Sequence, residues 1–211
     1  MKYKVIELDH KTEYVFSLKV QRPNCEIMPG QCFNVGIPGM GINREYSIYS
    51  NPDEPYLEFL IRKVNCGIVS LALSKLKVND ELEIDGPYGE FCISPLNLLK
   101  EVYFIATGTG IAPFHSFVKT YQELNYKLIH GIRYPNEQYD LNDYKRESYV
   151  PCISSSSDVK TKRVTDYLKN NKIPLNSQVY ICGNRNMIVE VVEELLNQGL
   201  NGSQIITEVF F

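Results

Sequence analysis

The sequence has no long hydrophobic segment. Its most apolar runs are short, such as Val102–Ala106, and none approaches the roughly 20 residues that a membrane-spanning helix needs. The first residues lead directly into a charged segment, without the apolar stretch of a secretion signal. We therefore expect a cytoplasmic protein that does not associate with a membrane.

An excess of charge of one sign is also absent. The 22 Lys and Arg residues are set against 25 Asp and Glu residues, which gives a net charge of −3. A dedicated nucleic-acid-binding module carries a strong basic excess, so no nucleic-acid partner is expected. Hydrophobic residues make up 44% and charged residues 22% of the chain, which excludes disorder of the chain as a whole.

Closely spaced metal ligands are missing as well. The six cysteines include no Cys-x-x-Cys pair, and the three histidines are scattered. Structural zinc and iron–sulfur clusters take closely spaced thiolates, so we expect no metal. The Gly-x-Ser-x-Gly elbow of many hydrolases is also lacking. Any redox chemistry must therefore come from a bound organic cofactor.

What the sequence does contain is two halves with different periodicity. The first has short β-branched and aromatic runs separated by Gly and Pro turns, which indicates an antiparallel barrel or sandwich. From about residue 100, short apolar runs alternate with helical patterns, which indicates a doubly wound α/β domain. The expected strands are 14–20, 46–50, 56–62, 81–84, 102–106, 127–132, 149–153, 178–182 and 205–211, and the expected helices are 68–76, 113–124, 164–170 and 187–198.

A glycine-containing segment connects an expected strand to an expected helix at Thr107–Pro113. Glycines at such a turn let the backbone approach a diphosphate, and the start of the helix offers N–H groups. Pro113 suits the first helical turn, where its missing N–H costs nothing. A plain strand-to-helix turn is the alternative.

Three further segments carry residues suited to binding. Arg44-Glu45-Tyr46-Ser47 offers a guanidinium for a phosphate next to an aromatic face, with an ordinary edge strand as the alternative. Gly67-Ile68-Val69-Ser70 opens a helix whose first N–H groups suit an anion, with a plain turn into the helix at Gly67 as the alternative. Cys182-Gly183-Asn184 ends an apolar strand, where open α/β sheets bind ligands, although a buried cysteine and a turn glycine are common.

The order and spacing of these segments, together with Gly86–Phe91 and the aromatic terminus Glu208–Phe211, resemble the ferredoxin–NADP reductase superfamily in a compact form without an iron–sulfur domain. The resemblance covers nearly the whole chain. It implies a six-stranded antiparallel Greek-key-type β-barrel that binds FAD over residues 1–97. It also implies a doubly wound parallel α/β domain that binds NAD(P) over residues 98–211.

The resemblance also implies a role for individual residues. Arg44 would hold the FAD diphosphate, and Phe210 would cover the flavin. The residues implied to bind FAD are Arg44, Glu45, Tyr46, Ser47, Ile61, Lys63, Gly67, Ile68, Val69, Ser70 and Phe210. Those implied to bind NAD(P) are Gly108, Thr109, Gly110, Ile111, Ala112, Pro113, Arg133, Ser154, Arg163, Cys182, Gly183, Asn184 and Met187. The residues implied to assist hydride transfer from the nicotinamide to the flavin are Ser47, Cys182 and Glu208.

Two departures from the family pattern bear on specificity. NADP-specific members often place an arginine after a serine where this chain has only serines, Ser154–Ser157. Arg133 and Arg163 sit where family members often keep phosphate-binding arginines, with solvated surface charge as the alternative, so NADPH is the expected donor and NADH the alternative. The iron–sulfur cysteines of some members are absent, so the one-electron partner is expected to be a separate ferredoxin or flavodoxin.

Three functions stay open at this point. The leading one is a ferredoxin–NADP reductase-like flavoprotein. An NAD(P)H:flavin reductase, or the reductase component of a multicomponent oxygenase, is the alternative within the superfamily. A non-enzymatic redox-sensing or partner-binding subunit is the alternative from another class. Acidic carriers generally dock on a basic face, and the candidates for one are Lys2, Lys4, Lys11, Lys19, Arg22, Arg62 and Lys63, with scattered surface charge as the alternative. The oligomeric state cannot be read from the sequence.

Overall fold

The computed structural model describes residues 1–155 and 162–210, and its chain divides into two units. The first unit comprises Met1–Cys92 together with Ala112–Thr120, and the second comprises Ile93–Ile111 and Tyr121–Phe211. Helix α2 (Ala112–Thr120) therefore belongs with the first unit, although the residues on both sides of it in the chain belong to the second.

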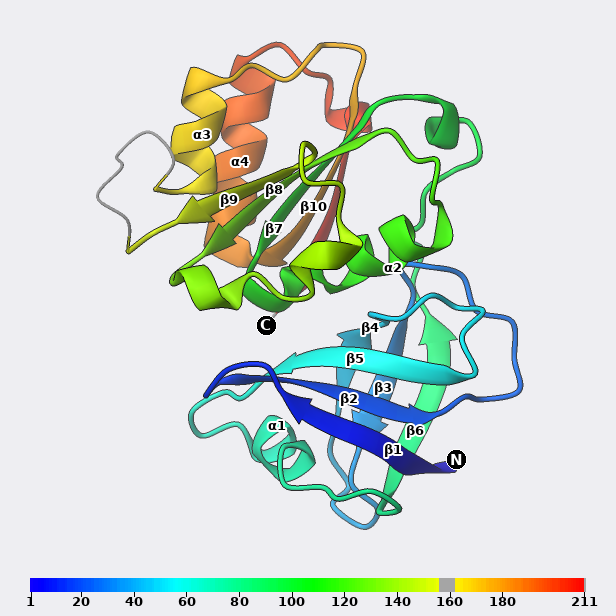
Figure 1. The fold of residues 1–211 in the computed structure, drawn as a ribbon. Helices are drawn as coiled ribbons and strands as arrows, with labels where there is room; N and C mark the ends of the chain where they lie inside the picture. The colour runs from blue at the N-terminus through cyan, green and yellow to red at the C-terminus, as the bar shows by residue number, and fades with distance from the viewer. Residues whose placement is uncertain (156–161, 211) are drawn as a thin grey trace. The chain divides into compact units, whose positions relative to one another are not determined.

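The first unit is an antiparallel barrel (Figure 1). Its strands pair in the order β4-β3-β6-β1-β2-β5. A bridge between Ile48 and Phe59 joins the continuation of β4 to β5 and closes the ring. The strands are β1 (Lys2–His10), β2 (Val15–Gln21), β3 (Cys32–Gly36), β4 (Asn43–Ser47), β5 (Tyr56–Arg62) and β6 (Glu81–Tyr88), and helix α1 (Ile68–Leu73) lies between β5 and β6 in the chain.

The barrel interior is filled by alternate side chains of its strands. Phe16, Leu18 and Val20 of β2 are fully buried, as period-2 alternation requires of the inner face. Phe33 and Phe59 meet edge to face with ring centroids 6.2 Å apart. Burying one such side chain stabilises the fold by about 1.5–3 kcal/mol. The predicted six-stranded antiparallel barrel is confirmed.

Helix α2 packs within this first unit through aromatic and polar contacts. The His115 ring stacks on Tyr49 with centroids 3.8 Å apart, and Nδ1 of His115 lies 2.6 Å from the Tyr49 carbonyl oxygen. The Ser116 hydroxyl donates to the carbonyl of Ser50 over 2.8 Å. A Cβ on Gly30 would lie 2.7 Å from the Phe117 ring, so this close approach requires glycine.

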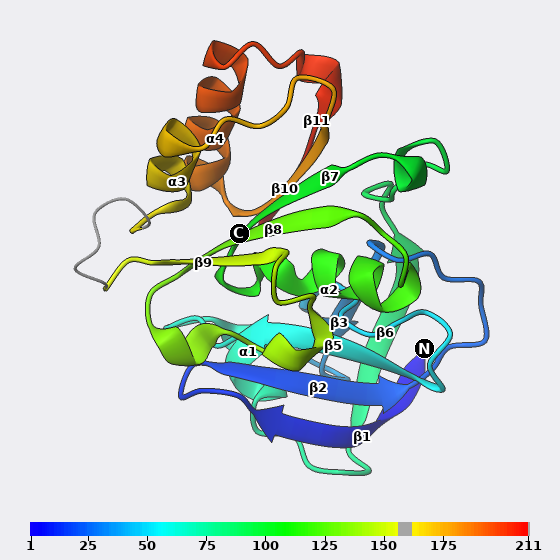
Figure 2. The same cartoon turned by 45° about the horizontal axis from the view of Figure 1, so that its top comes forward.

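The second unit is a parallel five-stranded sheet in the order β11-β10-β7-β8-β9. Helices α3 and α4 lie side by side on one face of it, as Figure 2 shows. The strands are β7 (Val102–Thr107), β8 (Tyr126–Ile132), β9 (Tyr149–Ile153), β10 (Gln178–Asn184) and β11 (Ile205–Phe210), and the helices are α3 (Val164–Asn170) and α4 (Arg185–Asn197). Short 3₁₀ turns are η1 (Asn97–Leu99), η2 (Gly108–Ile111), η3 (Pro135–Glu137), η4 (Leu141–Asp143) and η5 (Gly202–Gln204).

The expected helix–strand alternation of the second half is confirmed, with most boundaries within two residues of the prediction and one shifted by four. The predicted helix 113–124 ends at Thr120, because the chain turns there and Leu124 N–H bonds to the Tyr121 carbonyl. Helix α4 begins where the Asn184 side chain accepts a hydrogen bond from the Asn186 N–H over 2.9 Å, an N-cap. None of the described helices is long and apolar enough to span a membrane.

Candidate functional site

Strand β4 carries a cation and an aromatic ring on one face of the barrel unit. Alternation puts Arg44 and Tyr46 on the same side of the strand. Arg44 is exposed, its Nη1 donates to the Asn43 carbonyl over 2.9 Å, and it forms no ion pair with any carboxylate of residues 1–155 or 162–210. Burial raises the pKa of the Tyr46 phenol to about 12, so the phenol stays neutral. A guanidinium without a partner carboxylate suits a phosphate.

The start of helix α1 offers backbone donors in the same unit. The N–H groups of Ile68, Val69 and Ser70 have no acceptor within the described part of the chain. The Ser70 hydroxyl instead accepts a hydrogen bond from Val64 N–H over 3.1 Å and holds the preceding turn. A Cβ on Gly67 would lie 2.9 Å from both Ser70 Oγ and Val64 Cβ, so this turn requires glycine.

Each of these features suits a phosphate group, such as those in the diphosphate of a dinucleotide like FAD. The arginine supplies charge, the three N–H groups supply directed donors, and the tyrosine supplies a flat surface. Of the other residues expected here, Glu45 is exposed and Ser47 is buried at the end of β4. Ile61 is buried within β5, and Lys63 N–H donates to the Tyr14 carbonyl over 2.8 Å.

In the second unit, two glycine turns meet at the carboxyl ends of neighbouring parallel strands β7 and β10. A Cβ on Gly110 would lie 2.5 Å from the Cys182 carbonyl oxygen. Gly183 has φ +136°, and a Cβ there would lie 2.3 Å from Thr107 Oγ1. That hydroxyl oxygen accepts a hydrogen bond from Asn184 N–H over 3.0 Å. This end of an open α/β sheet is where ligands bind, and glycines, which carry no side chain, allow a nucleotide to approach the backbone closely.

Cys182 and Glu208 form a pair on adjacent strands β10 and β11. They are register partners, and the Cys182 thiol donates to Glu208 Oε2 over 3.7 Å. Burial, and secondly the Glu208 carboxylate, raises the pKa of the Cys182 thiol well above its usual value. Cys182 therefore remains a protonated thiol and acts as a hydrogen-bond donor, not as a nucleophile.

Of the candidate 2′-phosphate ligands, Arg133 follows strand β8 and Arg163 is the N-cap residue of α3. Arg133 and Arg163 are exposed and form no ion pair with a carboxylate in the described ranges. The Glu137 carboxylate accepts hydrogen bonds from the backbone N–H groups of Arg133 and Tyr134, which leaves the guanidinium over the Tyr134 ring at 5.3 Å. Ser154 N–H donates to the Ile132 carbonyl, whereas Ser156 and Ser157 lie outside the described residues.

Other predicted site residues fall in different surroundings. Met187 is 8% exposed and packs in the core beneath α3 and α4. Ala112 and Pro113 are buried in α2, which belongs to the barrel unit. Phe210 is half-buried at the end of β11 in the second unit, opposite Asn184, and Phe211 lies outside the described residues.

One residue that the sequence analysis did not assign to a site lies against the glycine loop after β7, which is the turn η2 (Gly108–Ile111). His130 of β8 is fully buried, with Nε2 2.9 Å from the Gly108 carbonyl oxygen and Nδ1 2.8 Å from the Tyr149 hydroxyl. Burial lowers the pKa of His130 to about 4. The sequence signal that could have found it is a histidine in the apolar strand that follows the glycine segment and its helix in the chain.

Comparisons with known proteins agree with this geometry. Residues 3–93 match the family model for an oxidoreductase FAD-binding domain, and residues 104–193 match that for an oxidoreductase NAD-binding domain. The chain is 31% identical to a ferredoxin–NADP reductase of Azotobacter vinelandii, over 93% of this chain and 89% of that protein. The chain belongs to the ferredoxin–NADP reductase family.

Further matches show the range of proteins to which the chain is similar. A crystal structure of a Neisseria gonorrhoeae ferredoxin NADP+ reductase with bound FAD and NADP matches with a TM-score of 0.87 and 26% identity, covering 100% of this chain and 98% of that one. The reductase component of a Rhodococcus jostii propane 2-monooxygenase is 29% identical over 98% of this chain and 62% of that protein. The predicted FAD-dependent NAD(P)H oxidoreductase class and its two cofactors are confirmed.

Proposed function

We propose that this ferredoxin–NADP reductase-type enzyme holds FAD tightly and exchanges electrons with a separate one-electron carrier in the cytoplasm, a ferredoxin or a flavodoxin. The observation that carries the proposal is Arg44 together with the three N–H groups at the start of α1. A flavin reductase that releases its flavin does not need both an arginine and helix N–H groups to bind a diphosphate. The alternative of an oxygenase reductase component shares this chemistry and differs in its acceptor.

The proposed domain and residue assignment follows from the sequence. The FAD domain spans 1–97 and the NAD(P) domain spans 98–211, which the family matches at 3–93 and 104–193 support. FAD, when bound, accepts a hydride from NAD(P)H and releases electrons one at a time. The chain's own residues bind and orient: Arg44 and α1 would hold the diphosphate, and Gly108–Gly110 with Gly183 would let the nucleotide approach the backbone.

The protein's contribution to the reaction is positional rather than acid–base. Hydride transfer moves no proton to or from the protein, and Cys182 is held as a neutral thiol beside Glu208. The Cys182–Glu208 pair would place fixed polar groups near the nicotinamide. Ser47 would supply a hydroxyl near the flavin. We therefore assign Ser47, Cys182 and Glu208 to orientation of the reacting rings.

NADPH is the proposed donor, with NADH as the alternative. Arg133, which follows β8, and Arg163, the N-cap residue of α3, are both exposed and have no carboxylate partner among the described residues. A 2′-phosphate requires such charge, because serine hydroxyls alone hydrogen-bond a phosphate without neutralising it.

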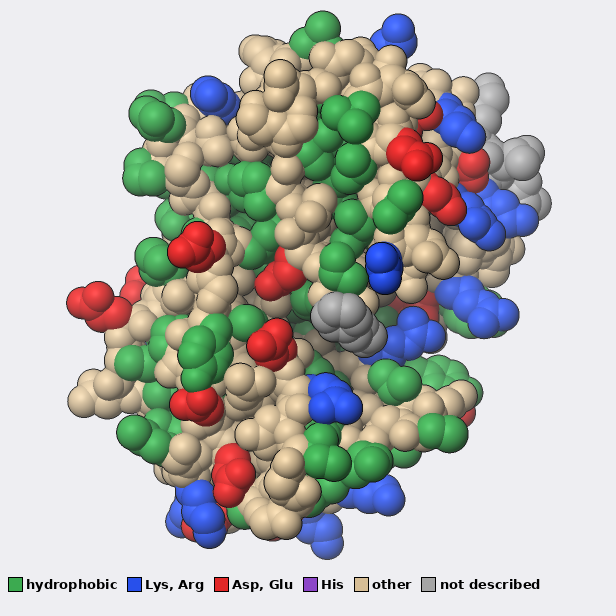
Figure 3. All heavy atoms as spheres, turned by 180° about the vertical axis from the view of Figure 1, so that it is seen from behind, with side chains coloured by type: hydrophobic (Ala, Val, Ile, Leu, Met, Phe, Trp, Pro, Cys, Tyr) green, Lys and Arg blue, Asp and Glu red, His purple; other side chains and the backbone are tan. Residues whose placement is uncertain are grey.

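The expected basic docking face for an acidic carrier receives limited support. Lys2, Lys11 and Lys19 are in ion pairs with Glu81, Asp9 and Glu7, respectively, at 2.9–3.1 Å. Acidic and basic side chains both lie on the face drawn in Figure 3. The remaining candidates Lys4, Arg22, Arg62 and Lys63 would have to carry the attraction, so the choice of carrier stays a proposal.

The test of the proposed function is retention of flavin and choice of acceptor. Protein loaded with FAD is passed through gel filtration, and its NADPH-dependent reduction of ferredoxin and of flavodoxin is compared with its reduction of added free flavin. Retained FAD and faster reduction of a protein carrier support the proposal. Loss of FAD with faster reduction of free flavin supports the flavin reductase, and a protein that binds no FAD supports the non-enzymatic subunit.

A further inference from the structure

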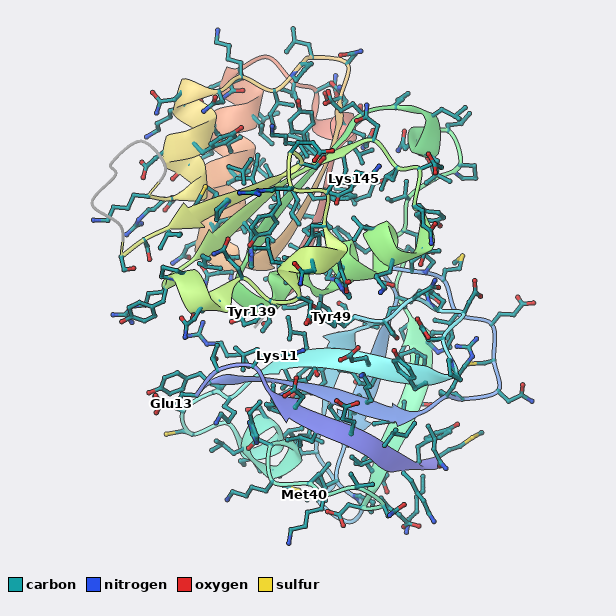
Figure 4. The ribbon with its side chains drawn as sticks, in the orientation of Figure 1. Lys11, Glu13, Met40, Tyr49, Tyr139 and Lys145 are labelled. Atoms are coloured by element: carbon teal, nitrogen blue, oxygen red, sulfur yellow. The ribbon has the colours of Figure 1, made fainter. Side chains whose placement is uncertain are left out.

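His130 sits between the nucleotide loop and a neighbouring strand, entirely inside the second unit. It lies on β8 directly opposite Ala106 of β7 and Pro151 of β9, and it is 0% exposed. Its two ring nitrogens reach Gly108 of the glycine loop and Tyr149 of β9. The Tyr139 ring, on the segment that leads from β8 to β9 (Figure 4), lies 6.4 Å away, centroid to centroid.

The two partners fix which nitrogen of His130 carries the proton. A carbonyl oxygen only accepts, so Nε2 must donate to Gly108. Nδ1 is then unprotonated and accepts a hydrogen bond from the Tyr149 hydroxyl. Both nitrogens of a neutral imidazole are satisfied in this way, whereas an imidazolium would place a charge in a buried, apolar environment. The titratable groups that face the ring are the phenols of Tyr139 and Tyr149.

The hydrogen bond from His130 to the Gly108 carbonyl also fixes the orientation of the whole Gly108–Thr109 peptide. Gly108 has φ +52°, in the left-handed region where glycine is favoured, so the loop conformation is not one that the backbone adopts by default. In the trans peptide that follows, the Thr109 N–H points opposite to the Gly108 C=O. A donor that pulls the carbonyl toward β8 therefore aims the Thr109 N–H away from β8.

We propose that His130, in its neutral Nε2–H form, is a positioning residue for the pyridine nucleotide. The hydrogen bond from Tyr149 keeps His130 in this form, and His130 in turn orients the Gly108–Thr109 peptide. It thereby orients the glycine loop on which the nucleotide would lie. This inference rests on the proposed function, since it assigns the residue to the site where NAD(P) is proposed to bind. His130 touches neither cofactor itself and acts through the loop backbone.

The test compares two substitutions of similar size that differ in the donor. His130→Gln places an amide N–H near the position of Nε2, whereas His130→Met fills the space without a donor. Tyr149→Phe removes the support for Nδ1. Each full-length, FAD-loaded protein is titrated with the oxidised nucleotides NADP+ and NAD+ by calorimetry, and kcat and KM are measured separately.

For His130→Met we expect Kd and KM for the nucleotide to rise by about 10-fold with a smaller change in kcat, because one directed hydrogen bond to the loop is lost. His130→Gln is expected to recover most of the affinity, and Tyr149→Phe to lie between wild type and His130→Met. The visible spectrum and the affinity for FAD, which depend on the barrel unit, should be unchanged in all three.

Three results would overturn the assignment. His130→Met with wild-type nucleotide affinity would show that the loop does not need the donor. Glutamine as weak as methionine would show that shape or packing, not the N–H, matters. Loss of FAD binding together with nucleotide binding would indicate general unfolding instead of loop positioning. A wild-type protein that binds neither nucleotide contradicts the proposed function as well, which separates the two failures.

Discussion

The thiol of Cys182 and the carboxylate of Glu208 face each other across two parallel strands, with Sγ 3.7 Å from Oε2. The pair lies beside Gly183, whose backbone lies close to Gly110 in the turn after β7. A buried cysteine that donates to a carboxylate gives the edge of this loop a fixed polar group. This relationship connects the end of the chain to the site proposed for the nicotinamide.

Cys182→Ala is expected to lower kcat by about 5- to 10-fold, because Glu208 loses a donor worth about 1 kcal/mol. Steady-state kinetics with NADPH and a one-electron acceptor measure it. Cys152→Ala is the matched control, since Cys152 is an equally buried cysteine on β9 within the core beneath α3. Equal losses of kcat in the two variants would show that Cys182 is a packing residue.

Arg44→Ala is expected to weaken FAD binding by about 10- to 100-fold, because a hydrogen bond to a charged group is worth about 1.5–3 kcal/mol. Titration of the apoprotein with FAD, followed by quenching of flavin fluorescence, gives the two dissociation constants. Arg62→Ala, at the exposed end of β5, serves as the control and should bind FAD as wild type does. An unchanged Kd for Arg44→Ala would remove this residue from the diphosphate site.

Gly110→Ala is expected to lower the Tm and to weaken NADP+ binding, because the added Cβ would lie 2.5 Å from the Cys182 carbonyl oxygen and force the two turns apart. Thermal unfolding and calorimetric titration report the two effects. Gly202→Ala provides the comparison, since a Cβ there meets nothing within 4 Å. If both alanine variants behaved as wild type, the close contact between the β7 and β10 turns would be wrong.

His130 should make stability depend on pH. Its pKa is about 4 in the folded protein and about 6.5 in an unfolded chain, so the unfolded state binds more protons between these values. Stability is then lost as the pH falls from about 6.5 toward 4, by about 2 kcal/mol between pH 7 and pH 5. Urea unfolding of wild type and His130→Gln at both pH values isolates this contribution, which the glutamine variant lacks. An identical pH dependence in both would contradict a neutral, buried His130.

Arg133→Ala and Arg163→Ala are expected to raise KM for NADPH by about 10-fold while leaving KM for NADH within about twofold, since only NADPH carries the 2′-phosphate. The ratio of kcat/KM for the two donors is the measurement. Arg146→Ala, at another exposed arginine of the second unit, is the control. If neither substitution changed that ratio, the proposed phosphate role of these arginines would fail.

Much of the fold follows from local sequence pattern, and the strands that escaped prediction have physical reasons for doing so. Strand β1 buries only Val5 completely and otherwise carries charged or half-exposed side chains, so it shows no apolar run. Strand β3 has five residues between turns. Both are specified by their partners in the barrel and not by their own hydrophobicity.

The site was predictable where its residues are neighbours in the chain and not where the fold brings them together. The Arg44–Ser47 and Gly108–Pro113 segments are local patterns. The contact of His130 with Gly108 depends on the register of β7 against β8, and that of Cys182 with Glu208 on the register of β10 against β11. Register between parallel strands is a tertiary property, so no window of sequence reports it.

The most direct test of the central claim is anaerobic mixing of the FAD-loaded protein with NADPH, and in parallel with NADH, while the flavin absorbance is recorded. The account predicts rapid bleaching by NADPH and slower bleaching by NADH, with recovery of the absorbance when oxidised ferredoxin or flavodoxin is added. Faster bleaching by NADH would contradict the NADPH assignment alone. A protein whose bound flavin is bleached by neither donor would contradict the account as a whole.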